Sequence, residues 1–219
     1  MDYRKELERV REALKGISKP YDNEALELIA EGMYGTVLVA EQNLSEQNNC
    51  WENSALVREF LDYASILEGY DHLLNAIYSA TKRMAETIYD HPRLKVQFLE
   101  FFRKVIFRIE AQQGHELSIG EDIAEEISEL EYNIYFADKC EYDQIKQSGH
   151  LKHDPIEWSA RWEEVIDEAD KITYSILADH PRGMGFCHAY WHTRASILHE
   201  QFGIEWRSPS AMNPRVMFD

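Results

Sequence analysis

Residue types that could perform chemistry gather towards the C-terminal end of this sequence, between Asp179 and Asp219. This stretch holds four of the nine histidines and two of the five tryptophans. His188 and His192 are four residues apart, so on a helix their imidazole rings lie one turn apart on one face and can meet one metal ion. His199 continues the line but lies about 10 Å farther along the axis. That is too far for a shared ion with ligand distances of about 2 Å. His188 and His192 are therefore candidate ligands of a divalent metal, completed by a side chain from another helix.

A second interpretation of the same helix is structural. Its histidines share a side with large apolar residues, namely Met184, Trp191, Leu198 and Phe202. Such histidines are often partly buried and bonded to a carbonyl or a carboxylate. No glutamate follows His188 in the HExxH arrangement of zinc proteases. A metal pair and a structural histidine face both remain open.

The turn before this helix, Pro181–Gly185, reads PRGMG. Free N–H groups at a helix start attract anions, so Arg182, Gly183 and Gly185 form a candidate anion-binding site. The spacing matches no phosphate loop, and a simple helix-entry turn also explains the glycines.

Two acidic motifs follow one another along the chain: EEISE at residues 125–129 and EEVID at residues 163–167. The pattern resembles the paired acidic motifs of the all-helical MazG-like nucleotide pyrophosphohydrolases. The resemblance covers only these ten residues and implies magnesium-dependent release of pyrophosphate from a nucleoside triphosphate. The sequence departs from that pattern because the apolar stripe of the second helix leaves Glu164 and Asp167 on the opposite, solvent-facing side. A third motif, His153-Asp154, matches the HD pair of metal phosphohydrolases, but Pro155 follows directly, so Asp154 is better interpreted as a helix cap.

The chain is strongly acidic, with 40 Asp and Glu against 23 Lys and Arg and a formal net charge of -17. This charge repels phosphate backbones and anionic lipid, so we expect no nucleic-acid and no membrane partner. It suits cationic partners, divalent metals or plain solubility. Three widely spaced cysteines and a charged N-terminal segment without an apolar core predict a cytoplasmic location without disulfides.

Helical periodicity of apolar residues recurs along most of the chain and predicts an all-α fold. We expect a multi-helix bundle of about seven helices with a non-helical C-terminal tail packed on the body. Thr36–Val39 would also suit a strand, but a single strand has no partner, so this segment is expected to be helical despite Gly32 and Gly35. The helix that begins near Glu121 is expected to run to about Lys146.

The segment 149–155, GHLKHDP, is the clearest candidate linker. We therefore expect a helical bundle at 1–148 and a C-terminal helical pair with an ordered tail at 156–219, although the two could form one continuous domain. The tail carries large apolar residues that disordered tails rarely hold: Trp206, Met212, Val216, Met217 and Phe218.

The leading functional hypothesis is a binding protein that acts on a protein partner or self-associates. This hypothesis rests on amphipathic helices that carry no complete set of catalytic residues. The same observation favours a protein that is not an enzyme. The first alternative is a metal-dependent hydrolase that uses His188 and His192 with a divalent metal. The second is the MazG-like pyrophosphohydrolase.

Overall fold

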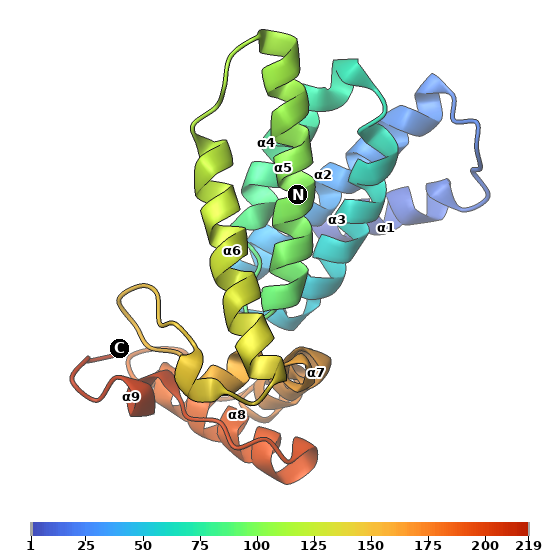
Figure 1. The fold of residues 1–219 in the computed structure, drawn as a ribbon. Helices are drawn as coiled ribbons and strands as arrows, with labels where there is room; N and C mark the ends of the chain where they lie inside the picture. Colours follow the sequence, from blue (N-terminus) through green and yellow to red (C-terminus); the bar gives the residue numbers. More distant parts are fainter. Residues whose placement is uncertain (1, 219) are drawn as a thin grey trace. The chain divides into compact units, whose positions relative to one another are not determined.

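The computed structural model describes residues 2–218, in which every regular element is a helix and no strand occurs. The predicted all-α class is confirmed. The α-helices are α1 (Tyr3–Leu14), α2 (Asn23–Ser45), α3 (Asn53–Leu67), α4 (Leu74–Ala85), α5 (Pro92–Gln113), α6 (Ile119–Asp138), α7 (Ala160–Ile176), α8 (Phe186–Phe202) and the one-turn α9 (Pro209–Met212) (Figure 1). Short 3₁₀ turns lie between them: η1 (Cys50–Glu52), η2 (Asp71–Leu73), η3 (Tyr142–Gln144) and η4 (Pro155–Trp158).

The chain forms two compact units. Unit 1 consists of Met1–Tyr89 and Leu94–Ile127, and unit 2 consists of Asp90–Arg93 and Ser128–Asp219. Helices α5 and α6 each contribute residues to both units. The segment 149–155, for which we predicted a linker, lies inside unit 2, and the tail is bonded to it through Lys152 and Asn213.

Several helices begin at side chains that cap their first N–H groups. Asp22 accepts a hydrogen bond from the Ala25 N–H at 2.8 Å and starts α2, and Ser159 accepts one from the Trp162 N–H at 3.2 Å and starts α7. Asp154 caps η4, as predicted, and forms a reciprocal capping box with Glu157. These caps satisfy N–H groups that have no partner inside the helix.

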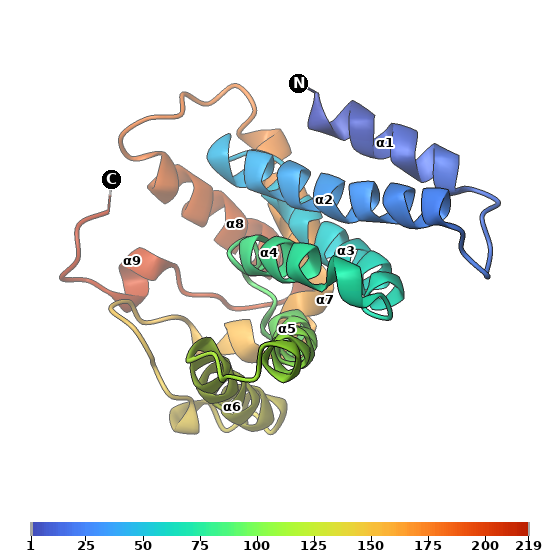
Figure 2. The same cartoon turned by 90° about the horizontal axis from the view of Figure 1, so that it is seen from above.

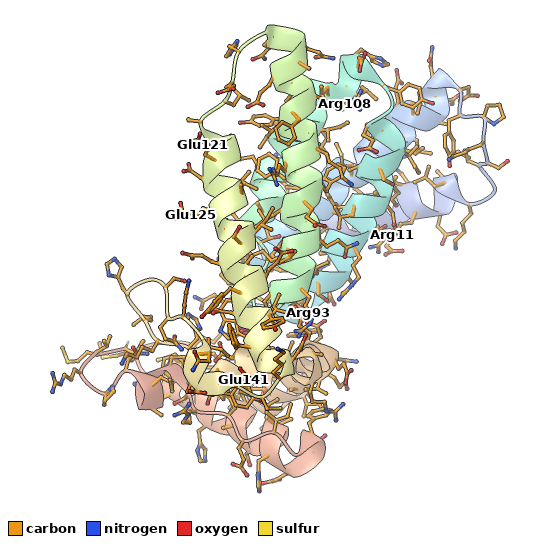
Figure 3. All side chains as sticks on the ribbon, viewed as in Figure 1. Arg11, Arg93, Arg108, Glu121, Glu125 and Glu141 are labelled. Carbon is orange, nitrogen blue, oxygen red and sulfur yellow. The ribbon has the colours of Figure 1, made fainter. Side chains whose placement is uncertain are left out.

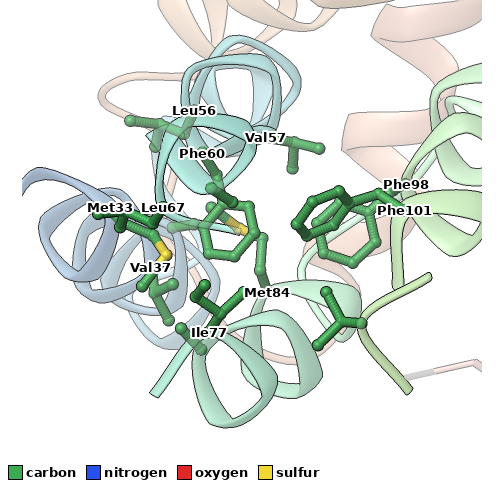
Figure 4. Close-up of a cluster of buried hydrophobic side chains, with 14 of the residues drawn as sticks. Met33, Val37, Leu56, Val57, Phe60, Leu67, Ile77, Met84, Phe98 and Phe101 are labelled. Atoms are coloured by element: carbon green, nitrogen blue, oxygen red, sulfur yellow. The ribbon is translucent and has the colours of Figure 1, made fainter. Parts of the chain in front are cut away.

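The core of unit 1 lies among α2, α3, α4 and α5. Its central side chains, including Val37, Phe60, Ile77, Met84 and Phe98, are fully buried (Figure 4). The rings of Phe60 and Phe98 lie 5.7 Å apart between centroids. Helix α5 contributes Phe98, Phe101 and Val105, among other residues, to this core.

Helix α2 runs unbroken through both of its glycines, so the segment Thr36–Val39 is helical as expected. A Cβ atom at Gly32 would lie 2.9 Å from the Tyr63 ring, and one at Gly35 would lie 3.0 Å from Leu7 Cδ1. The glycines weaken the helix locally but let α3 and α1 approach its backbone. Figure 2 shows α2 between α1 and α3.

The core of unit 2 joins α7, α8 and the tail. Trp162 is fully buried, and its ring centroid lies 5.9 Å from that of Trp206 in the tail. Near the chain end, Phe218 packs edge to face on Trp191 of α8, with 5.0 Å between centroids. The tail therefore packs on the body as predicted, although α9 adds one helical turn to it.

Helix α6 ends at Asp138, eight residues earlier than the predicted end near Lys146. Cys140 then adopts a left-handed backbone with φ 57°, which terminates the helix. The following segment turns back, and the Lys146 N–H donates to Asn133 Oδ1 at 2.8 Å. Separately, none of the helices in residues 2–218 combines the length and apolar composition that a bilayer crossing requires.

Candidate functional sites

The predicted metal pair lies on the outward face of α8, where His188 and His192 are both exposed. His188 Nε2 lies 3.3 Å from the Phe218 carbonyl oxygen, and its ring packs edge to face on Trp191. His199, farther along the helix, pairs with Glu205 at 2.7 Å. Within residues 2–218, no group of three or more His, Cys, Asp or Glu side chains is placed to hold a metal ion. Metal binding by His188 and His192 therefore stays a prediction, and the ion would need further ligands beyond this pair.

The predicted anion site forms the entry turn of α8. Gly185 has a left-handed φ of 83° at the helix start, and the Phe186 N–H donates to the Gly183 carbonyl at 3.0 Å. The Arg182 guanidinium lies over the Tyr174 ring, 5.2 Å from its centroid, and over the Phe186 ring at 5.5 Å. This geometry gives Arg182 a cation–π role on the α7–α8 hairpin. Anion binding at Arg182, Gly183 and Gly185 remains a prediction.

The acidic motif of α7 is engaged by Asp90–Arg93, the segment that leads into α5 and includes its first two residues. Glu163 accepts a hydrogen bond from the Arg93 N–H at 2.6 Å, and Asp167 Oδ1 lies 3.2 Å from His91 Nε2. Glu164 is exposed, as its place on the helix predicted, and pairs with Arg161. Asp167 is half-buried instead, because the Asp90–Arg93 segment covers its side of α7.

A buried ion cluster centres on Arg194 of α8. Its side chain is 7% exposed, with Nη2 2.7 Å from Asp90 Oδ2 and Nε 2.9 Å from Asp170 Oδ1. The guanidinium also lies 5.0 Å from the ring centroids of both Trp162 and Trp206. Two carboxylates and two indole faces thus compensate one cation that water barely reaches.

The electrostatics of this cluster follow from burial and from its close charges. Burial opposes the charge of Arg194, but Asp170 and Asp90 raise its pKa well above the ordinary value, so it stays protonated. Burial raises the pKa of Asp170 to about 6, against the opposing effect of Arg194. The pKa of the Tyr190 hydroxyl is also raised by burial, which keeps it neutral. Asp170 is therefore a carboxyl group that keeps its proton to a higher pH than an ordinary aspartate.

The sequence does not reveal this cluster, because Asp90-His91-Pro92 has the composition of an ordinary helix break. Asp90 adopts φ 57°, and its carbonyl accepts the Trp162 indole N–H at 3.0 Å, so the break is also an anchor. The same tripeptide recurs at 179–181, where all three residues are exposed. One signal was readable in α8: Arg194 precedes Ile197 and Leu198 by three and four residues, which places an arginine on the apolar face.

Unit 1 carries a groove of about 750 Å³ beside the first half of α2. Its residues on α2 recur at helical spacing along one face of the helix, and η2 forms the opposite wall. We call this surface the α2 groove. It is lined by Asn23, Leu26, Glu27, Ala30, Glu31, Tyr34, His72 and Leu73. Figure 2 shows the start of α2 and the turn before α4 at the same end of the unit.

The floor of the α2 groove is apolar and its edge is acidic. Leu26 is buried, Ala30 and Leu73 are half-buried, and the Tyr34 hydroxyl donates to the Ala76 carbonyl at 3.2 Å. Glu27 and Glu31 are exposed one helical turn apart. Glu31 pairs with Arg9 at 3.0 Å, whereas Glu27 makes no ion pair within residues 2–218. The groove therefore offers apolar surface next to negative charge.

Comparison with known proteins adds no relative. No family model matches the chain, and no curated protein or solved structure matches it.

Proposed function

We propose that this protein is a binding protein that holds a basic, amphipathic helix of a protein partner in the α2 groove. The observation that carries the proposal is an apolar floor bordered by exposed glutamates one helical turn apart. Amphipathic helices bind such grooves through apolar side chains at helical spacing, with charges at the rim.

The dimensions of the groove suit a helix of about three turns. Its α2 residues run from Asn23 to Tyr34, which corresponds to about 16 Å along the helix axis. Glu27 and Glu31 would pair with lysine or arginine side chains four residues apart on the partner, because both helices share the same rise per turn. Leu26, Ala30 and Leu73 would receive the apolar side chains between them. Ala30 is small enough to let the two helices approach closely.

Charge favours a basic partner over a second copy of this chain. The net charge of -17 repels another copy, and it attracts a basic segment from a distance. Binding should therefore weaken with salt, because exposed charges are screened over about 8 Å at physiological ionic strength.

The test uses a fluorescein-labelled synthetic helix of leucine and lysine with its apolar residues at helical spacing. A scrambled peptide of the same composition controls for net charge. Fluorescence polarisation should show tighter binding of the amphipathic peptide. We expect the double variant E27K/E31K to weaken binding by about tenfold, because two rim attractions become repulsions.

The matched control is E121K/E125K, which makes the same change in net charge on α6 of unit 1. Glu121 and Glu125 are exposed one turn apart, away from the lining of the groove (Figure 3). Equal loss in both double variants would mean that binding is non-specific electrostatics and would overturn the proposal.

A steric variant tests the floor without changing charge. Ala30→Phe places a ring in the groove and should abolish peptide binding while circular dichroism and the melting temperature show a folded chain. Light scattering on the free protein tests whether a second copy of this chain occupies the groove instead. A dimer that A30F converts to a monomer would assign the groove to a second copy and refute the basic-helix partner.

A further inference from the structure

Unit 2 contains a second cavity, which is separate from the α2 groove and shares Trp206 with the surroundings of the buried ion cluster. It has a volume of about 490 Å³ and lies between η4, the start of α7 and the extended segment Gly203–Arg207. This volume falls in the range of small-molecule sites, about 300–1,000 Å³. We call it the tail pocket.

The tail pocket combines an apolar wall with two guanidinium groups. Pro155, Ile156 and Ile204 supply apolar surface, and Arg161 and Arg207 line the same cavity. Among the described residues 2–218, Arg161 is paired only with Glu164, at 3.0 Å, and both side chains are more than half exposed. Such an exposed pair contributes little, about 0–1 kcal/mol, so Arg161 is readily available to a ligand.

Arg207 is held in position by hydrogen bonds to Asp154. Asp154 is buried and accepts the Arg207 backbone N–H at 2.7 Å, its Nε–H at 3.0 Å and its Nη2–H at 3.3 Å. The negative charge of Asp154 is thereby compensated inside the protein. The Arg207 side chain remains 61% exposed, and a guanidinium has five N–H donors, so donors remain beyond those that face Asp154.

The other polar groups of the tail pocket do not oppose an anion strongly. Burial raises the pKa of Tyr142, so its hydroxyl stays neutral and can donate a hydrogen bond. Glu205 is 86% exposed and pairs with His199 at 2.7 Å, which draws its carboxylate towards α8.

From this arrangement we propose that the tail pocket binds a small organic acid, with its carboxylate between Arg161 and Arg207 and its apolar body on Ile156 and Ile204. Planar guanidinium groups match the two oxygens of a carboxylate, and the apolar wall selects for a hydrocarbon or aromatic body. This site is independent of the α2 groove, so either proposal can fail while the other stands.

The test is isothermal titration of the full chain with hexanoate and phenylacetate, each compared with its neutral amide and with inorganic phosphate. The carboxylates should bind, and the amides and phosphate should bind at least about tenfold more weakly, because each lacks the charge or the apolar body. Arg161→Ala should weaken carboxylate binding by about tenfold. The control is Arg9→Ala, because Arg9 is paired with Glu6 three residues away at comparable exposure in unit 1.

Any of four results would overturn the proposal. The amides could bind as well as the acids, phosphate could bind as well as hexanoate, or R9A could lose as much affinity as R161A. Absence of binding by both carboxylates at millimolar concentration would do the same. Circular dichroism of R161A guards against loss of fold, and Ile156→Ser, which removes half-buried apolar wall but no charge, should separately weaken phenylacetate more than phosphate.

Discussion

Replacing Arg194 with methionine tests the buried ion cluster, because it removes the guanidinium and keeps a long unbranched side chain beside the two indole rings. Asp90 and Asp170 then lose the cation that lies 2.7 and 2.9 Å from them. Breaking a buried ion pair by removing one partner costs about 3–5 kcal/mol, because the remaining charge stays in a poorly solvated site. We expect R194M to lower the unfolding free energy by about 3 kcal/mol at pH 8. The lower end applies because Asp90 is still 32% exposed to water.

Urea denaturation followed by tryptophan fluorescence at pH 8 and pH 5 measures this loss. Without Arg194, the lowering effect on the pKa of Asp170 disappears, so this carboxyl protonates more readily than in the parent protein. The loss should therefore be smaller at pH 5. The triple variant D90N/D170N/R194M should recover most of the stability, since it leaves no uncompensated charge. The exposed control R161M should cost less than about 1 kcal/mol. A cost of R194M that matches this control, or that is the same at both pH values, would refute the reasoning.

Three further predictions concern stability and metal binding. Burial raises the pKa of Asp170 from 3.8 to about 6, so its contribution to stability is complete below pH 4 and is lost as the pH rises through 6. D170N mimics the neutral acid, so the unfolding free energy of D170N minus that of the parent should rise by up to about 3 kcal/mol between pH 4 and pH 8. A difference that denaturation experiments find constant with pH contradicts this. Gly32→Ala should destabilise unit 1 by about 1 kcal/mol because its Cβ would meet a tyrosine ring at 2.9 Å, whereas Gly120→Ala, with its nearest neighbour at 3.7 Å, should be neutral or stabilising by thermal melts. If His188 and His192 bind zinc, a hundredfold excess over Kd should stabilise the parent by about 3 kcal/mol and H188A/H192A much less; equal melting temperatures with and without zinc, nickel or manganese would dispose of the metal pair.

Whether a candidate site can be predicted from the sequence depends on how close together in the chain its residues are. The histidine pair was readable because residues four apart on one helix must share a face. Its surroundings were not readable, because the position of Phe218 beside His188 depends on how the tail returns to α8. The α2 groove was missed for a similar reason: Glu27 and Glu31 look like an ordinary solvated face until η2 supplies the opposite wall.

What the sequence by itself determined is the all-α class and part of the helix pattern, because apolar periodicity, a capping residue such as Asp154 and the prolines act within a few residues. Within residues 2–218 the number of helices is higher than expected, and α6 ends earlier than expected. The tertiary structure alone decided which polar residues are buried. Asp90 lies 104 positions before Arg194, and only the packing of α7, α8 and the Asp90–Arg93 segment brings the two together. The two identical Asp-His-Pro turns therefore lie in different environments: residues 90–92 contribute to the buried ion cluster, and residues 179–181 are exposed. Burial is set by contacts distant in sequence and not by the tripeptide itself.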